Sequence, residues 1–122
     1  MRWSIVLVDL GQTVGHEQSG TRRVLVVSNE AFHRSGLVTV CPITASRSEA
    51  RFRGDVPIPA GEGGQTLDGI VICSQVRTLS TRRILVRPLG LVVDPFIRAS
   101  VRRNLRHHFG LDIPPVVDRA AA

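Results

Sequence analysis

Ser4 to Leu10 reads SIVLVDL and Arg22 to Ser28 reads RRVLVVS, and these two runs indicate the class of fold. Both are short, almost continuous stretches of β-branched and aliphatic residues, separated by a polar loop from Gly11 to Gly20. Such runs are typical of strands that are buried on both faces. They predict two neighbouring strands at the start of a β-rich domain.

The same pattern continues along the chain, with turn-forming segments between the apolar runs. It predicts further strands at Leu37–Ile43, Arg53–Ile58, Asp68–Cys73 and Ile84–Val93, the last one broken at Pro88–Gly90. Pro42 predicts an edge strand or a strand end, because proline lacks the N–H that a sheet requires. Asn29 is suited to cap one helical turn that ends at Gly36. Short strands at this spacing favour a small closed barrel.

One later segment has helical periodicity. Asp94 is suited to cap a helix that begins with Pro95, and Gly110 is a stop signal. The result should be an amphipathic helix laid on the barrel. Its expected apolar face holds Ile97, Val101, Leu105 and His108, and its expected polar face holds Arg98, Arg102, Arg103 and Arg106. With 122 residues there is room for one domain, expected over residues 1–111, followed by a flexible tail over residues 112–122.

The charge of the chain is concentrated near its end. All 16 cations are arginine, and the window from Arg82 to Arg106 has Asp94 as its single acid and carries the whole net charge of +6. Such a patch suits nucleic-acid phosphate or an acidic protein, and a solvated helix face explains it equally well. The sequence has no run of 18 apolar residues, so we expect no membrane span and a cytoplasmic location.

Cysteine and histidine give no pattern of metal ligands. Cys41 and Cys73 lie inside apolar runs and are expected to be buried free thiols, as in a reducing compartment. His107 and His108 adjoin each other but lack a second pair of ligands. We therefore expect no metal site and no cofactor.

Three polar segments are candidates for chemistry. The first loop ends with an imidazole, a carboxylate, an amide, hydroxyls and a guanidinium, and two further segments follow predicted strands. The residues concerned are His16, Glu17, Gln18, Ser19, Thr21 and Arg22 in the loop, then Thr44 and Ser46, then Gln75 and Arg77. Each segment also has a structural interpretation, in which these groups only close turns or satisfy loop carbonyls.

Taken in order, four blocks of the chain resemble the MazF/PemK family of toxin endoribonucleases from toxin–antitoxin pairs. The blocks are Ile5–Leu10, Gly15–Arg22, Val24–Asn29 together with Val40–Thr44, and Asp68–Thr78. The resemblance runs from about Ile5 to the C-terminal helix. It implies a mainly β, SH3-like barrel of the MazF/CcdB type, with short helices and a C-terminal amphipathic helix, acting as a homodimer.

The resemblance also implies an activity. Members of the family cut single-stranded RNA, including mRNA, at short motifs without a metal, which inhibits translation and growth, and a MazE-like antitoxin with an acidic tail blocks the groove. The implied products carry 2′,3′-cyclic phosphate and 5′-hydroxyl ends. The essential arginine of the family matches Arg22, and its threonine matches Thr44. Glu17 and His16 match positions that line the family's site.

Further RNA contacts are expected around this core, and the loop from Ala45 to Phe52 is expected to read part of the base sequence. The expected RNA-binding residues are Gln18, Ser19, Thr21, Ser46, Arg47, Arg51, Gln75 and Arg77. The chain departs from the family pattern in three places. Arg2-Trp3-Ser4 replaces the usual Arg-Gly-Asp/Glu, Arg23 replaces a proline, and Ser74 stands where some members have an acid.

Two other functions remain open at the level of sequence. One is a CcdB-like toxin, which shares the barrel and inhibits DNA gyrase without catalysis. The other is a simple RNA-binding barrel that uses the basic window 82–106. The pair Arg22 and Thr44 favours the enzyme, because CcdB-like action relies on C-terminal residues.

Overall fold

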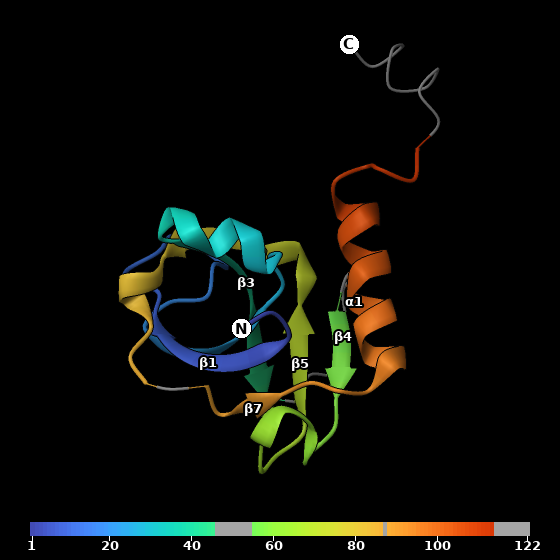
Figure 1. Cartoon of the computed structure of the whole chain (residues 1–122), viewed down its shortest axis with the longest axis horizontal. Helices are drawn as coiled ribbons and strands as arrows, with labels where there is room; N and C mark the ends of the chain where they lie inside the picture. Colours follow the sequence, from blue (N-terminus) through green and yellow to red (C-terminus); the bar gives the residue numbers. More distant parts are fainter. Residues whose placement is uncertain (46–54, 87, 114–122) are drawn as a thin grey trace.

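The computed structural model describes residues 1–45, 55–86 and 88–113. Over these residues the chain forms an antiparallel sheet that curls on itself, with short 3-10 helices and one α-helix (Figure 1). The strands are β1 (Ser4–Asp9), β2 (Thr21–Val26), β3 (Leu37–Ala45), β4 (Asp55–Ile58), β5 (Gly69–Ile72), β6 (Arg77–Ser80) and β7 (Gly90–Leu91). The helices are η1 (Glu30–Ser35), η2 (Glu62–Gly64), η3 (Cys73–Gln75), η4 (Thr81–Arg83) and α1 (Pro95–His108). The predicted mainly β fold with a C-terminal helix is confirmed.

β3 is the central strand, and it changes partners along its length. The strand order is β4-β5-β3-β2-β1-β7, and β6 pairs with the first half of β3. On one side Pro42 lies opposite Val24 of β2, while on the other side β6 pairs up to Val40 and β5 pairs from Ile43 onward. The prediction that Pro42 marks an edge is therefore wrong. Proline is tolerated here because it lies between the two partners, where no ladder pair forms on that side.

Both faces of the central strands are buried, as their continuous apolar runs predict, and each face meets a different cluster. The inner cluster, which the curled strands surround, contains Val6, Val8, Leu10, Val24, Val26, Val38, Val40 and Leu79. The outer cluster, which α1 covers, contains Trp3, Ile5, Leu25, Val27, Cys41, Ile43, Val56, Ile58, Val71, Cys73, Val92, Ile97 and Val101. One layer of strands thus separates two hydrophobic cores.

Cys41 and Cys73 are both buried in the outer cluster as free thiols, as expected from the sequence. A hydrogen bond with Cys73 and burial together raise the pKa of the Cys41 thiol. A neutral thiol of this kind behaves as a small apolar group in the core.

The predicted last strand, Ile84–Val93, is mostly irregular, and this prediction is wrong apart from the two residues of β7. Ile84 forms a single bridge with Val8, and Leu89 donates its N–H to the Ile5 carbonyl at 2.7 Å. Pro88 prevents a regular ladder, because it has no N–H to donate. Strand pairing therefore gives a half-barrel, in which the two residues of β7, the Ile84 bridge and single backbone hydrogen bonds link this segment to β1.

The strand β6 lies outside the strands that the apolar runs predict. Its side chains alternate: Leu79 is buried in the inner cluster, and the Thr78 hydroxyl is exposed and shares a hydrogen bond of 2.7 Å with Thr39. A four-residue strand with one buried apolar side chain has too little hydrophobic signal to be recognised.

The cap of α1 is where the sequence predicts it, since the Asp94 carboxylate accepts from the Phe96 N–H at 2.8 Å. Val101 is fully buried, whereas His108 is exposed, so its place on the apolar face was wrong. Arg98 is also misplaced on the polar face. Its Nε donates to the Val92 carbonyl at 2.7 Å and its guanidinium lies 5.5 Å from the centre of the Trp3 ring.

Trp3 adopts a left-handed backbone conformation with φ of 69°, which is rare for a bulky residue. The family pattern has glycine at this place, and glycine adopts such a conformation without strain. Trp3 is only 8% exposed, with Arg2 on its ring at 5.2 Å in addition to Arg98. The left-handed backbone costs roughly 1–2 kcal/mol in strain. Burial of the indole, together with the contacts that the two cations make with its ring, offsets this cost.

We expect Trp3→Ala to lower the free energy of unfolding by about 3–5 kcal/mol, because burial is lost and the strain remains. Trp3→Gly should cost about 1 kcal/mol less, since glycine removes the strain. Urea unfolding followed by circular dichroism measures both, because each variant lacks the single tryptophan of the chain. An alanine variant at least as stable as the glycine variant would show that the left-handed backbone at residue 3 is not strained.

Candidate active site

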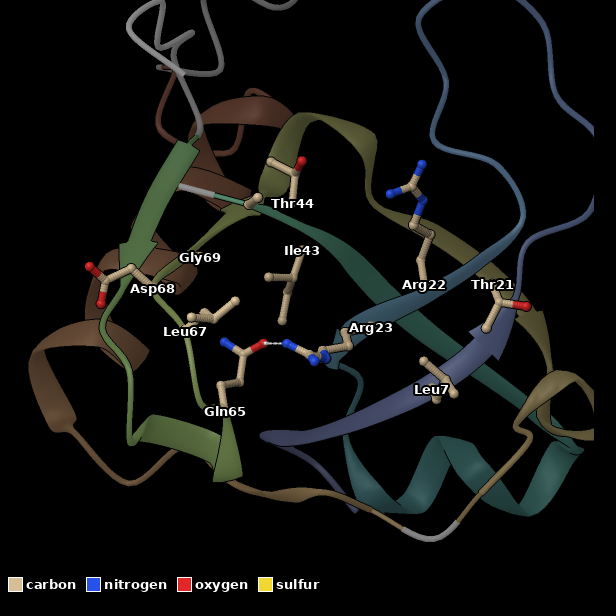
Figure 2. Close-up of a pocket in the computed structure, with 11 residues that line it drawn as sticks. Leu7, Thr21, Arg22, Arg23, Ile43, Thr44, Gln65, Leu67, Asp68 and Gly69 are labelled. Atoms are coloured by element: carbon tan, nitrogen blue, oxygen red, sulfur yellow. Dashed lines mark hydrogen bonds between the residues drawn. The ribbon is translucent and has the colours of Figure 1, made fainter. Parts of the chain in front are cut away.

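A pocket of about 250 Å³ opens where the ends of β2, β3 and β5 meet, and we name it the Arg22 pocket (Figure 2). Its walls combine cations, hydroxyls and an amide with a few apolar side chains. It is lined by Leu7, Thr21, Arg22, Arg23, Ile43, Thr44, Ala45, Gln65, Leu67, Asp68 and Gly69. The structure therefore brings together the two residues that matched the family's essential pair.

The register of the sheet explains why Arg22 and Thr44 meet. Val24 of β2 lies opposite Pro42 of β3, and the strands are antiparallel. Arg22 and Thr44 lie two residues beyond this pair, each on the same face of its strand as Val24 or Pro42, and both line the pocket. Arg23, the next residue of β2, points to the other face and toward Gln65 (Figure 2).

The Arg22 guanidinium is held by a backbone group. Its Nε donates to the Ser19 carbonyl at 3.0 Å, and no acid within the described ranges forms an ion pair with it. The contact orients the guanidinium plane, while the charge is not neutralised. An exposed, oriented and uncompensated guanidinium is suited to bind a phosphate through two parallel hydrogen bonds.

A second pocket, of about 400 Å³, adjoins the first along β3, and we name it the Gln75 pocket. It is lined by Glu17, Gln18, Pro42, Ser74, Gln75, Val76 and Arg77. Pro42 lines this pocket, and Thr44, which lies two residues further along the same face of β3, lines the Arg22 pocket. The two pockets are therefore neighbours on the surface of one strand.

Gln75 fixes the loop that lies between the pockets. Its Oε1 accepts from the Gln18 N–H at 2.8 Å, and its Nε2 donates to the His16 carbonyl at 3.1 Å. Together with the bond from Arg22 to Ser19, these contacts hold the loop from both sides. Gln75 thus makes contacts of the kind that the structural interpretation expects, and they hold a loop that carries candidate catalytic groups.

The two candidate bases lie on this loop. Glu17 lines the Gln75 pocket, and its Oε1 accepts from the Val14 N–H at 2.9 Å. The His16 side chain is exposed. Thr21 lines the Arg22 pocket and Arg77 lines the Gln75 pocket, whereas Ser46, Arg47 and Arg51 lie outside the described residues.

Arg23, Gln65 and Asp68 line the Arg22 pocket and were missed by sequence reasoning. Gln65 follows the glycine-rich turn Gly61–Gly64, whose sequence is typical of a turn and indicates no site. Arg23 is adjacent to the expected arginine, and its exchange for the usual proline was the one available signal.

The basic window 82–106 does not form one patch. Arg83 of η4 donates to the Asp9 carbonyl at 3.2 Å, and Arg98 packs on Trp3. On α1, a separate hollow of about 540 Å³ is lined by Ala99, Arg102, Arg103, Arg106 and Asp112. None of these arginines lines the Arg22 or the Gln75 pocket.

Two kinds of feature are absent from the described part of the chain, a metal-binding cluster and a membrane-spanning helix. No three side chains from His, Cys, Asp or Glu gather in a way that could hold a metal ion. No helix has the length and apolar character needed to cross a bilayer.

The sequence model of a family described as PemK-like, MazF-like toxin of type II toxin-antitoxin system matches residues 1–109. The chain is 36% identical over 104 residues to the endoribonuclease toxin ChpB of Escherichia coli strain K12, an alignment that covers 84% of this chain and 88% of ChpB.

Solved structures give the same relationship. A crystal structure of MazF from Deinococcus radiodurans is 30% identical, with a TM-score of 0.73 over 88% of this chain and 94% of that one. A crystal structure of MazE-MazF from the same organism is 30% identical, with a TM-score of 0.69 over 89% and 94% of the two chains.

If Gln75 anchors the loop, Gln75→Leu should speed hydrogen exchange of the Gln18 amide about tenfold, because that N–H loses its acceptor. The strand amide of Val24 should exchange as before. Exchange measured by NMR checks this, with Gln12→Leu as a control that removes an exposed amide from the same loop. Equal exchange of the Gln18 amide in both variants would show that Gln75 does not hold the loop.

Proposed function

The chain belongs to the PemK-like, MazF-like toxin family of type II toxin–antitoxin systems, and we propose that it is a toxin that cleaves single-stranded RNA. The observation that carries the proposal is the uncompensated Arg22 guanidinium in a pocket that Thr44 also lines. The relative ChpB, an endoribonuclease toxin, supports it. A gyrase inhibitor of the CcdB type would have no use for this pair.

The proposed reaction uses the 2′-hydroxyl of the RNA as the nucleophile. Its oxygen forms a bond to the adjacent phosphorus, and the bond from phosphorus to the 5′-oxygen breaks. The products are a 2′,3′-cyclic phosphate and a 5′-hydroxyl. Negative charge develops on the non-bridging oxygens in between. We assign its stabilisation to the Nη groups of Arg22 and to the Thr44 hydroxyl, which donates a hydrogen bond.

A base must take the proton from the 2′-hydroxyl, and the leaving 5′-oxygen must gain one. We assign the first role to Glu17 or His16, both on the loop that Gln75 and Arg22 hold. Such a base contributes roughly 10²–10⁴-fold to the rate. Solvent water supplies the proton that the leaving 5′-oxygen gains, and Arg22 is the proposed hydrogen-bond donor that stabilises this oxygen until then. Ser74 stands where some relatives have an acid, so the loop supplies the base.

The RNA would follow the two adjoining pockets across the loop. Gln18, Thr21, Gln75 and Arg77 line this track and are the proposed RNA contacts together with Ser19. We further propose that the toxin acts in the cytoplasm as a homodimer. A MazE-like antitoxin with an acidic segment would inhibit it, in line with the similarity to MazE-MazF.

Removal of the guanidinium tests the assignment of Arg22. In EDTA, we expect Arg22→Ala to lower the cleavage rate of a long single-stranded RNA at least about 100-fold, as expected for loss of a group that stabilises developing charge. Arg22→Lys should not restore it, because an ammonium cannot form the bidentate contact. Mapping of the RNA ends gives both rate and products.

Arg34→Ala is the matched control, since Arg34 is an exposed arginine on η1 and lines neither pocket. It should cleave like the wild type. Near-native cleavage by Arg22→Lys would contradict the assignment. RNA left intact by a well-folded wild type would favour gyrase inhibition or simple binding instead.

The reaction also predicts a requirement in the substrate. A single 2′-deoxy substitution at the nucleotide 5′ of the scissile phosphate should abolish cleavage, because the nucleophile is absent, while binding changes little. Gel analysis of an otherwise identical RNA measures cleavage, and competition against uncut RNA measures binding. A 2′-deoxy substitution one nucleotide away is the control and should be cut; cleavage at the substituted nucleotide would rule out this nucleophile.

A further inference from the structure

Gln65 lines the Arg22 pocket with a buried donor that has no partner. The residue is 5% exposed, and its Nε2 forms no hydrogen bond within the described residues. A buried amide donor without an acceptor is costly, and buried polar groups are nearly always satisfied. Its position in a pocket wall suggests that a ligand supplies the missing acceptor.

The orientation of this amide is set by Arg23. The Nη1 of Arg23 donates to Oε1 of Gln65 at 3.4 Å, which identifies Oε1 as the acceptor side and places Nε2 on the side of the amide away from Arg23 (Figure 2). A reversed amide would face the guanidinium with two donors and is disfavoured. Arg23 and Gln65 therefore present guanidinium and amide donors side by side.

Gly69 packs closely against the Gln65 donor. A Cβ on Gly69 would lie 3.5 Å from Nε2 of Gln65, 3.2 Å from the Thr44 carbonyl oxygen and 2.9 Å from Cγ2 of Ile43. A side chain at this position would therefore crowd the pocket wall that holds the Gln65 amide. Leu67, which is 69% exposed, adds an apolar surface at the same pocket.

We propose that Arg23 and Gln65 form a base-reading subsite that selects a nucleotide whose base presents two adjacent acceptors. Guanine offers O6 and N7, and cytosine offers O2 and N3, whereas adenine and uracil present no two adjacent acceptors. The inference rests on the proposed function. Because Arg22 and Thr44 line the same pocket, the selected base adjoins the scissile phosphate.

Cleavage of a pool of random-sequence RNA, with the ends sequenced, tests the subsite. The wild type should enrich guanine or cytosine at one position beside the cut. Gln65→Leu, which keeps the size and removes the donor, should reduce that enrichment at least about tenfold while the preferences at other positions persist. Gln12→Leu is the matched control, because it removes an exposed glutamine outside both pockets, and it should leave every preference unchanged.

Two modified bases separate the possible sources of the acceptors. If guanine is selected, 7-deazaguanine should be cut at least about tenfold more slowly, because it lacks N7. If cytosine is selected, 3-deazacytosine should show the same loss. Gln65→Leu should erase the difference between the natural and the modified base, which a purely structural role of Gln65 would not do.

A second variant keeps the hypothesis testable if Gln65→Leu fails to fold, which a thermal unfolding measurement reveals. Arg23→Met releases the Gln65 amide and should also weaken the preference at that one position, with Arg34→Met as its control. An unchanged preference, or an equal fall in kcat for all sequences, would overturn the subsite. Absence of cleavage by the wild type would instead overturn the proposed function itself.

Discussion

β3 exchanges one partner for another in its middle, and both pockets depend on this exchange. β6 pairs with β3 up to Val40, and β5 takes over at Ile43. The two positions in between include Pro42, whose lack of an N–H removes nothing from the ladder on that side. The sheet therefore opens locally without leaving an unpaired donor at the proline. The Gln75 pocket and the Arg22 pocket lie on the two sides of this point.

The same exchange separates two requirements that would otherwise conflict. The strands must be apolar on both faces to build the inner and outer clusters, whereas a site for RNA must be polar. The polar residues of the site lie near the ends of these strands, with Arg22 second in β2 and Thr44 second from the end of β3. The buried middle of each strand fixes the register, and the register brings these polar ends to one pocket.

Strong local signals made most of the fold predictable. Continuous apolar runs identified β1, β2, β3 and β5, and the aspartate–proline pair identified the start of α1. β6 and the irregular segment after η4 could not be predicted in the same way, because their structure depends on partners distant in sequence. Arg98 shows the same limit. Its position on the helix predicts a side chain exposed to solvent, whereas in the structure its guanidinium packs on the Trp3 ring.

The site was predictable where the family pattern reaches and not beyond it. Arg22 and Thr44 could be named from the sequence, because each lies in a recognisable block. Gln65 could not, since its role depends on Arg23 in a different strand and on the missing side chain of Gly69. A single sequence does not indicate that two residues more than 40 positions apart will be in contact.

The way in which Arg22 is held has a consequence for any anionic partner. A carboxylate would orient the guanidinium as well as the Ser19 carbonyl does, but it would cancel the charge that a phosphate needs. Orientation by a backbone carbonyl keeps the full charge at the surface. An acidic peptide segment could meet the same guanidinium, because carboxylates fit the same fork as phosphates. Inhibition by an acidic antitoxin segment and recognition of the RNA phosphate would then be two uses of one electrostatic feature, and binding of one would exclude the other.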